Sequence, residues 1–328
     1  MKDLIRPLLC IAVLLFSACH KPAADAVSVS PAASESPSLI SASSPSPAAL
    51  SENETPPPVP EEPQLTPIEG STEKRGAYTI QESSFQWGEQ MVYGRMYLPN
   101  DGNQTWPTVI LSHGIGADIS HIEGLGMMFA ERGIAAYAFE FRGGSTTSSS
   151  TGSMLEMSVH TEREDLCNAI RHVQASGISE GHDLFLLGLS QGGYVTAEAA
   201  VLKQDQIAGL LLLYPAFNIN DLCEELYPDP SSIPETGVIF HQNVGRIYFE
   251  DALSEPIRED MANYHGPVLI IHGDQDRTVP ISYSEEAVQL YPDAELLVIE
   301  GCDHGFFGDQ RETAVNACTD FISRHSAS

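Results

Sequence analysis

The chain has 328 residues, of which 42% are hydrophobic, and it carries a formal net charge of −29 at pH 7. Its length suffices for one or two domains with a sizeable core. The acidic excess argues against a nucleic-acid partner and against electrostatic attachment to an anionic membrane surface, and no Cys-x-x-Cys or histidine-rich spacing typical of a metal site occurs.

The first residues have the features of an export signal. Lys2 and Arg6 precede an apolar run over residues 8–16, which is too short to cross a bilayer, and Ser17-Ala18-Cys19 follows. This segment resembles a bacterial lipoprotein signal, which would end at residue 19 and leave a lipidated Cys19 on the extracytoplasmic side. The only expected membrane contact is then the lipid anchor. The alternative is an ordinary secretory signal with an incidental cysteine, and both interpretations predict export.

Residues 20–76 are dominated by Pro, Ala, Ser and Glu. Such a segment buries too little apolar surface to offset the entropy cost of ordering it. We therefore expect a disordered tether over 20–76 and one folded domain over 77–328.

Strands and helices are expected to alternate through the first half of this domain. An alternating pattern over 78–98, interrupted at 87–90, predicts an antiparallel hairpin at a sheet edge. A strand over 109–111, a helix over 121–132 and a strand over 134–141 follow. A Ser/Thr-rich loop over 142–153 then leads to a helix that we expect to begin at a capping box over 161–164.

The most informative motif is Gly188-Leu189-Ser190-Gln191-Gly192. It follows an apolar strand over 183–187 and precedes a helix-compatible stretch over 194–203. A strand, a sharp turn and a helix are the context of a nucleophile elbow, in which a strained turn exposes the serine hydroxyl.

The alternation fails over 216–265, where we expect a small lid insertion between two core strands. Beyond it, a strand over 267–271 leads to Asp276, and a strand over 295–300 leads to His304. An acid and a histidine therefore follow the serine, each after a strand. Strands that alternate with helices predict an α/β fold with a mostly parallel sheet covered on both faces.

These residues resemble those of the α/β-hydrolase superfamily, and specifically its cinnamoyl/feruloyl-esterase-like branch. The segments that carry the resemblance begin at His113, Gly188, Gly245, Gly266 and Ile299. The resemblance implies the α/β-hydrolase fold, with Ser190 as nucleophile, Asp276 as acid and His304 as base. The chain order Ser, Asp, His is that of these enzymes. Asp274 competes with Asp276, but the family pattern His-Gly-x-x-Asp-x-x-Val-Pro favours Asp276.

Elementary chemistry agrees with these roles. A serine needs an imidazole to take its proton, and the imidazole needs an acid to fix its tautomer. A tetrahedral oxyanion needs preorganised amides, for which the backbone N–H groups of Ile115 and Gln191 are the candidates. We expect Asp303, His113 and His272 to order loops near the site.

The resemblance also implies that Asp221 and Tyr248, within the insertion, contact the phenolic end of an acyl group. The alternative is that Asp221 caps a short helix and that Tyr248 packs inside the lid.

The function expected from the sequence is that of a serine carboxylesterase, which cleaves small-molecule esters, including feruloyl or cinnamoyl esters, without a cofactor or metal. A serine peptidase of the same fold and a ligand-binding lipoprotein without turnover are the alternatives. The oligomeric state stays open, as does disulfide pairing among Cys167, Cys223, Cys302 and Cys318. For Cys318, on an apolar helical stripe, a buried free thiol is favoured.

Overall fold

The computed structural model describes residues 62–179 and 183–326. The predicted signal with Cys19, and the tether up to residue 61, lie outside these residues. Within the described part of the chain, no helix is long and apolar enough to cross a membrane.

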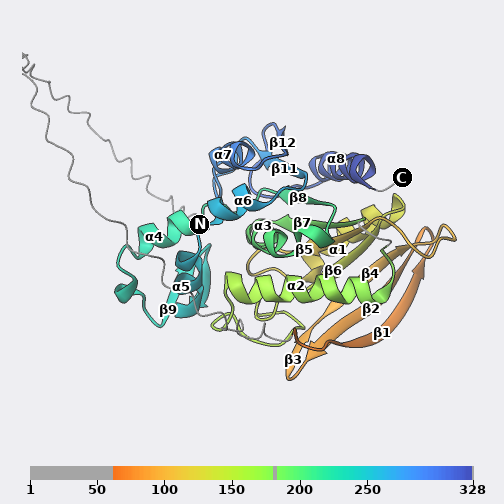
Figure 1. Ribbon diagram of the computed structural model, residues 1–328, viewed down its shortest axis with the longest axis horizontal. Helices are drawn as coiled ribbons and strands as arrows, with labels where there is room; N and C mark the ends of the chain where they lie inside the picture. The colour runs from red at the N-terminus through yellow and green to blue at the C-terminus, as the bar shows by residue number, and fades with distance from the viewer. Residues whose placement is uncertain (1–61, 180–182, 327–328) are drawn as a thin grey trace, which may run out of the picture. The chain divides into compact units, whose positions relative to one another are not determined.

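The described residues are built around one large mixed sheet (Figure 1). Its strands lie in the order β1-β2-β4-β6-β5-β7-β8-β11-β12, and β3 pairs with β2. The six strands from β6 to β12 in this order are parallel to their neighbours, whereas β1 to β4 pair antiparallel. The bounds are β1 Thr66–Arg75, β2 Tyr78–Trp87, β3 Gln90–Val92, β4 Gly94–Pro99, β5 Thr108–Ser112, β6 Ala135–Phe139, β7 Leu184–Leu189, β8 Gly209–Leu213, β11 Val268–Gly273 and β12 Ala294–Ile299.

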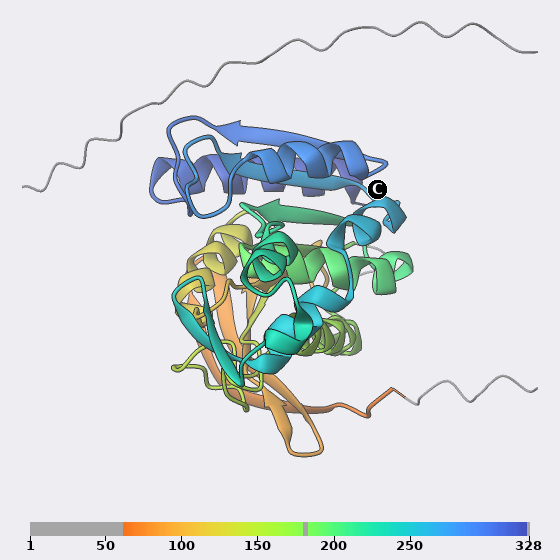
Figure 2. The same ribbon diagram turned by 90° about the vertical axis from the view of Figure 1, so that its left-hand side faces the viewer.

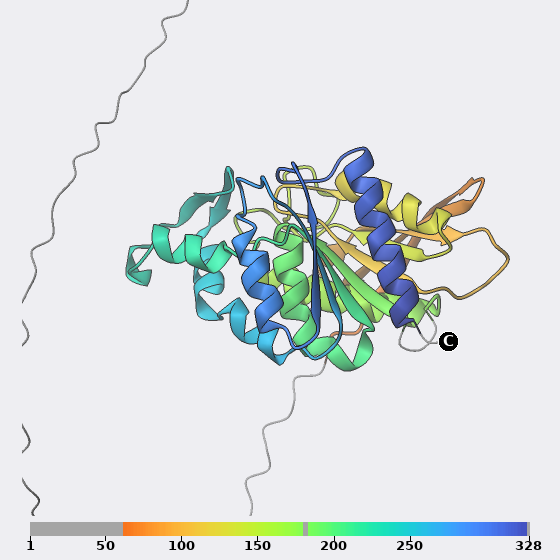
Figure 3. The same ribbon diagram turned by 90° about the horizontal axis from the view of Figure 1, so that it is seen from above.

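Helices cover both faces of the sheet, as the alternation predicts (Figures 1 and 3). Helices α1 (Ile119–Glu131) and α8 (Asp309–His325) bury apolar side chains in one core. Helices α2 (Val159–Ser176), α3 (Gln191–Lys203), α6 (Ile257–Asn263) and α7 (Ser282–Leu290) contribute to the other. Strand β5 shows why two cores form: Ile110 belongs to one core, whereas Val109 and Leu111 belong to the other.

The predicted boundary between tether and domain is wrong. Residues 66–75, which we assigned to the tether, form β1 and pair with β2, so the hairpin over 78–98 does not end the sheet. Every residue of β1 is exposed, and a strand with no buried face lacks the alternating pattern by which strands are recognised. Its position follows from pairing with β2 rather than from its own side chains.

Helix α2 begins earlier than predicted. Its N-cap is Ser158, whose side chain accepts a hydrogen bond from the Thr161 amide, and the Thr161 side chain accepts one from the Ser158 amide. A threonine thus stands where the usual capping box has Glu or Gln. The sequence pattern therefore did not indicate that the helix begins after Ser158.

The insertion over 216–265 forms short elements (Figures 2 and 3). They are α4 (Ile219–Leu226), a 3-10 turn η2 (Pro230–Ser232), an antiparallel hairpin of β9 (Thr236–Ile239) and β10 (Gln242–Gly245), α5 (Arg246–Ser254) and α6. A second 3-10 turn, η1 (Gln204–Gln206), precedes β8. Residues 246–251 belong to α5.

The four cysteines of the described residues are free. Cys302 and Cys318 are both buried in the core under α8, and burial raises the pKa of each thiol. A buried thiol at Cys318 is therefore confirmed.

Candidate active site

Ser190 lies in a strained turn between β7 and α3. Its backbone has φ 52° and ψ −121°, a conformation that a non-glycine residue rarely adopts. The turn is possible because Gly188 and Gly192 have no side chain: a Cβ would lie 2.3 Å from the Gly192 carbonyl oxygen in the first case and 2.4 Å from the His113 carbonyl oxygen in the second. The glycines of the motif thus let β7, α3 and the loop after β5 approach one another closely.

The structure brings Ser190, His304 and Asp276 together. Nε2 of His304 lies 3.0 Å from Oγ of Ser190, and Nδ1 lies 2.7 Å from Oδ2 of Asp276. Each side chain follows a different strand, namely β7, β11 and β12. The carboxyl ends of parallel strands meet at one edge of a sheet, where ligands bind in folds of this kind. This is the geometry of a nucleophile, a base and an acid that orients the base.

Asp276 is held as a carboxylate. Burial alone would raise its pKa, but hydrogen bonds from His272, from His304 and from the Val279 amide together hold the pKa below its ordinary value. His272 also contacts the Ser284 hydroxyl and the Val279 carbonyl oxygen. It therefore fixes the loop that carries Asp276, as expected.

Asp274 and Asp303 lie nearby but contact other groups. Asp274 accepts a hydrogen bond from the Gly301 amide at 2.6 Å. Asp303 accepts hydrogen bonds from the backbone amides of Arg277 and His304, so it joins the loop of the acid to the loop of the histidine.

The two candidate oxyanion donors are available. Among the hydrogen bonds of the described residues, none uses the backbone N–H of Ile115 or Gln191. Gln191 is the first residue of α3, where an N–H has no acceptor inside the helix and the helix dipole favours negative charge. Ile115 lines the same cavity as Ser190.

The Gln191 side chain holds this turn through buried hydrogen bonds, which the sequence did not indicate. Its amide nitrogen donates to Oε2 of Glu162 at 2.8 Å, and its oxygen accepts from the Tyr248 hydroxyl at 2.7 Å. All three side chains are buried, and burial raises the pKa of Glu162 well above its ordinary value.

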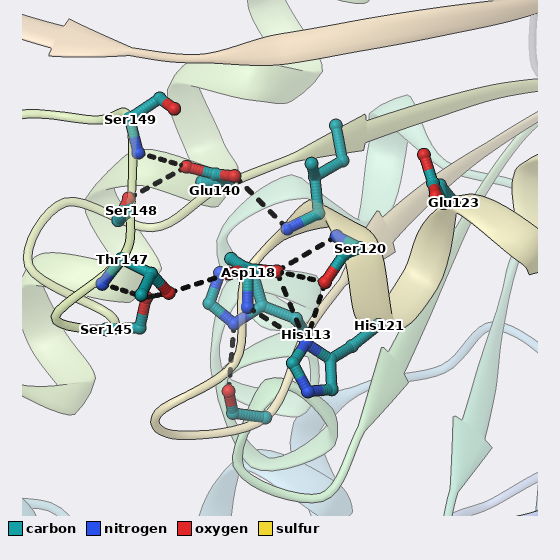
Figure 4. A network of polar contacts seen from close by, with 12 residues as sticks. His113, Asp118, Ser120, His121, Glu123, Glu140, Ser145, Thr147, Ser148 and Ser149 are labelled. Carbon is teal, nitrogen blue, oxygen red and sulfur yellow. Dashed lines mark hydrogen bonds and ion pairs between the residues drawn. The ribbon is translucent and has the colours of Figure 1, made fainter.

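A second network holds the loop of Ile115 (Figure 4). Burial lowers the pKa of His113, so its ring is neutral: Nδ1 donates to the Gly114 carbonyl oxygen and Nε2 accepts from the Phe141 amide. The Gly116 amide donates to the Gly144 carbonyl oxygen. The Ser/Thr-rich loop after β6 therefore supports the loop after β5.

Two acids organise this supporting loop (Figure 4). Glu140 accepts hydrogen bonds from the amides of Ile119 and Ser149 and from the Ser148 hydroxyl. Asp118 caps α1, and hydrogen bonds from Ser120 and Thr147 hold its pKa below the ordinary value. Glu140 directly follows β6 and Asp118 directly precedes α1, and these two positions are the sequence signals for their roles.

Ser190 and His304 open into a cavity of about 1190 Å³. Its walls come from the loop after β5, from α1, from the insertion and from the segment after β12. Most of the lining is apolar, and three exposed apolar side chains stand among the lining residues: Leu226, Val238 and Phe307. The polar lining includes Glu225, Arg277 and Arg311. A large cavity that combines apolar walls with polar groups suits a small organic ligand.

Neither predicted substrate-binding residue lines this cavity, so their expected contact with substrate is not found. Asp221, on α4, accepts hydrogen bonds from Arg258 and Tyr283. Tyr248, on α5, is fully buried against Gln191. Spacing within an insertion fixes neither the direction of a short helix nor the face on which its side chains lie, so the sequence placed these two residues at the cavity wrongly.

Tyr214 is a site residue that the sequence analysis missed. Its ring packs edge-on against His304, with a centroid distance of 4.8 Å, and it follows β8 with φ 39°. It restricts the orientation of the imidazole. Its position directly after a core strand, at the catalytic edge of the sheet, is the signal that would have found it.

Comparisons with known proteins agree with this architecture. A family profile described as "Serine aminopeptidase, S33" matches residues 104–248. A non-heme chloroperoxidase of Kitasatospora aureofaciens is 44% identical over 48 residues, which are 14% of this chain and 18% of that protein. The chain thus matches only about a fifth of the length of this curated relative.

Solved structures are similar over most of the described residues. Est1E of Butyrivibrio proteoclasticus, solved with ferulic acid bound, has a TM-score of 0.66 at 22% identity and covers 72% of this chain and 96% of its own. An acetyl xylan esterase of Paenibacillus sp. R4 has a TM-score of 0.62 at 14% identity over 81% of this chain and 90% of its own. A monoacylglycerol lipase of Paleococcus ferrophilus has a TM-score of 0.55 at 19% identity over 72% of this chain and 99% of its own. At such identities the likeness concerns the fold.

Proposed function

Because the chain has the α/β-hydrolase fold, we propose that it is a serine carboxylesterase that works through an acyl-enzyme. The observation that carries the proposal is the contact of His304 with both Ser190 and Asp276 beside a large apolar cavity. Two backbone amides without other acceptors complete the site.

The first half-reaction forms the acyl-enzyme. Oγ of Ser190 attacks the ester carbonyl carbon, and Nε2 of His304 takes the hydroxyl proton. The amides of Ile115 and Gln191 donate to the resulting oxyanion. His304 then gives its proton to the departing alkoxide, and an alcohol leaves. Asp276 stabilises the charged imidazole throughout without taking the proton.

The second half-reaction repeats these steps with water. His304 takes a proton from water, the hydroxide attacks the acyl carbon, and the proton returns to Oγ of Ser190 as the carboxylic acid leaves. Both tetrahedral intermediates use the same two amides, so one geometry serves both half-reactions.

A fluorophosphonate probe and nitrophenyl esters test this proposal. We expect the probe to label the wild-type protein but not Ser190→Ala, and we expect this variant to lower kcat by about 10⁶-fold. Glu131→Ala, at an exposed position on α1, is the matched control. Absence of both labelling and ester turnover in the folded wild-type protein would favour the ligand-binding alternative.

A serine peptidase is the second candidate, since the matching family profile describes an aminopeptidase. A peptidase that takes a free amino terminus needs an anionic group in its cavity, and Glu225 lines the wall. Comparing nitroanilides of amino acids with nitrophenyl esters separates the two candidates. Faster nitroanilide turnover, lost in Glu225→Gln, would establish the peptidase.

For the substrate we propose aromatic acyl groups of the feruloyl or cinnamoyl type. Est1E, whose structure holds ferulic acid, shares the fold, and the cavity is wide and largely apolar. Asp221 and Tyr248 do not line it, so selection for the phenolic hydroxyl must come from other lining groups. Methyl ferulate, methyl cinnamate and short aliphatic esters provide the comparison. Equal kcat/KM for all three would identify a general esterase.

We also propose that the protein is exported and held at the membrane by a lipid on Cys19. The support is the signal-like pattern of residues 1–19 and the Pro/Ser-rich stretch behind it.

A further inference from the structure

Three side chains capable of binding a metal gather away from the catalytic cavity. His160 lies near the start of α2, Glu198 lies on α3, and Glu255 directly follows α5. One ligand atom from each of them lies within 4.8 Å of the other two. None of the three lines the cavity of Ser190.

Glu198 is the most unusual member of the group. Its residue is 2% exposed, and its Oε2 is buried without a hydrogen-bond partner. Burial raises the pKa of this acid to about 8. Buried polar atoms almost always have partners, because leaving one unpaired costs free energy. The unpaired oxygen of Glu198 therefore points to a ligand independently of the cluster of acids around it.

His160 has the orientation of a metal ligand. Its Nδ1 lies 3.5 Å from Oδ1 of Asp251, whereas its Nε2 is buried without a hydrogen-bond partner and lies 3.5 Å from Oε2 of Glu255. Histidines that bind metals commonly direct the second ring nitrogen at a carboxylate, which fixes the tautomer. Asp251 is fixed in turn by the Ser158 hydroxyl.

The charges around this group leave room for a cation. The carboxylates that interact here are those of Glu198, Asp251, Glu255 and Asp260. Burial raises the pKa of Asp260 to about 6. The cation that faces them is Arg163, which donates to Glu255. Arg163 competes for that oxygen, but it supplies one positive charge against four potential negative ones.

We propose that His160 Nε2, Glu198 and Glu255 bind a divalent transition cation of the Zn²⁺ type, with water completing the coordination. One imidazole with two carboxylates matches the ligands of Zn²⁺, whereas Ca²⁺ and Mg²⁺ take oxygen ligands alone. The ion joins α2, α3 and the end of α5. It therefore fastens the insertion to the helix that follows the nucleophile and takes no part in bond cleavage.

The sequence did not indicate this site, because its ligands stand 38 and 57 residues apart on three elements. Such spacing matches no short metal motif. The packing of α2 against α3 and of α5 against α2 brings them together.

Zinc binding to the full-length protein tests the proposal. Chelator-treated protein is dialysed against ZnCl₂, and bound metal is counted by mass spectrometry while Tm is measured with and without zinc. We expect one Zn²⁺ per chain and a higher Tm in its presence. Both effects should be lost in Glu198→Gln. Asp251→Asn, which weakens the support of His160 without removing a proposed ligand, should weaken binding by about 10- to 100-fold.

Two controls keep the outcome unambiguous. His304→Ala should bind zinc as the wild type does, which separates this site from the catalytic histidine. Glu198→Gln keeps the size of this buried side chain, so its metal-free Tm should not fall; if it fails to fold, Glu255→Gln, at an exposed position, replaces it. The proposal is overturned if wild-type protein binds no zinc, if the Gln variant that folds retains it, if His304→Ala loses it, or if Ca²⁺ binds in preference.

Discussion

At the scale of single residues, the site depends on which aspartate orients His304. Oδ2 of Asp276 lies 2.7 Å from Nδ1 of the imidazole, whereas Asp274 binds the Gly301 amide. We expect Asp276→Asn to lower kcat by about 10⁴-fold, because the amide favours the wrong tautomer. Asp274→Asn should be much milder. Steady-state kinetics on one ester measure both variants, and equal losses would overturn the assignment of the acid.

A buried histidine far from the cavity should shape acid stability. His172 is buried beside Ser83, and burial lowers its pKa from 6.5 to about 4. A lowered pKa means that stability is present above pH 6.5 and is lost as the pH falls toward 4, because the unfolded chain takes up the proton first. The loss from this one group reaches about 3 kcal/mol.

The variant His172→Phe keeps an aromatic ring but cannot be protonated. We expect its free energy of unfolding to fall less than that of the wild type between pH 7 and pH 4.5, as measured by urea denaturation. His265→Gln, at an exposed position, should follow the wild type. Parallel curves for wild type and His172→Phe would show that His172 titrates alike in the folded and unfolded chains.

Ser190, Asp276 and His304 could be predicted from the sequence because the motif that contains each of them directly follows an apolar strand. Tyr214, Glu140 and the Glu162–Gln191–Tyr248 contacts did not, since they join side chains that are distant along the chain and that no short pattern links. Asp221 and Tyr248 were misplaced for a related reason: the short helices of an insertion are set by packing rather than by their own periodicity.

At the scale of elements, the loop after β6 supports the loop that carries Ile115. Glu140 holds this supporting loop through hydrogen bonds from Ser148 and Ser149, and it also accepts one from the Ile119 amide at the start of α1. Glu140→Ala should displace the Ile115 amide and lower kcat by up to about 10²-fold, with a smaller change in KM, because the amide acts mainly on the transition state.

The kinetics of Glu140→Ala and of Glu131→Ala on one ester provide this test. The second variant should behave as the wild type. A raised KM with unchanged kcat would instead mean that the loop only shapes substrate binding.

The expected α/β-hydrolase fold is confirmed. It could be predicted because the hydrophobic periodicity and the strand lengths are strong signals for buried parallel strands and for the helices that cover them. Strand β1 escaped detection since none of its side chains is buried. Element boundaries such as the start of α2 shifted where an unusual capping pair replaced the common one.

At the scale of the whole molecule, the proposed location at the membrane depends on a lipid on Cys19. We expect a lipid-labelled protein in the membrane fraction of a bacterial host, and Cys19→Ala should abolish the labelling. Two or three acyl chains suffice for stable attachment, whereas one is marginal. Mature soluble protein whose first residue is not Cys19 would contradict the lipid anchor.

The order of the catalytic parts along the chain has a consequence for biogenesis. Ser190 and His304 are 114 residues apart in the chain, and β8, the insertion, β11 and β12 lie between them. A chain that is still being synthesised or translocated therefore has a nucleophile but no proton acceptor. We expect the proposed hydrolytic activity to arise only when the last strand docks, so that its appearance during refolding reports completion of the fold. A protease that removes the segment after β12 should abolish this activity without cleaving near Ser190.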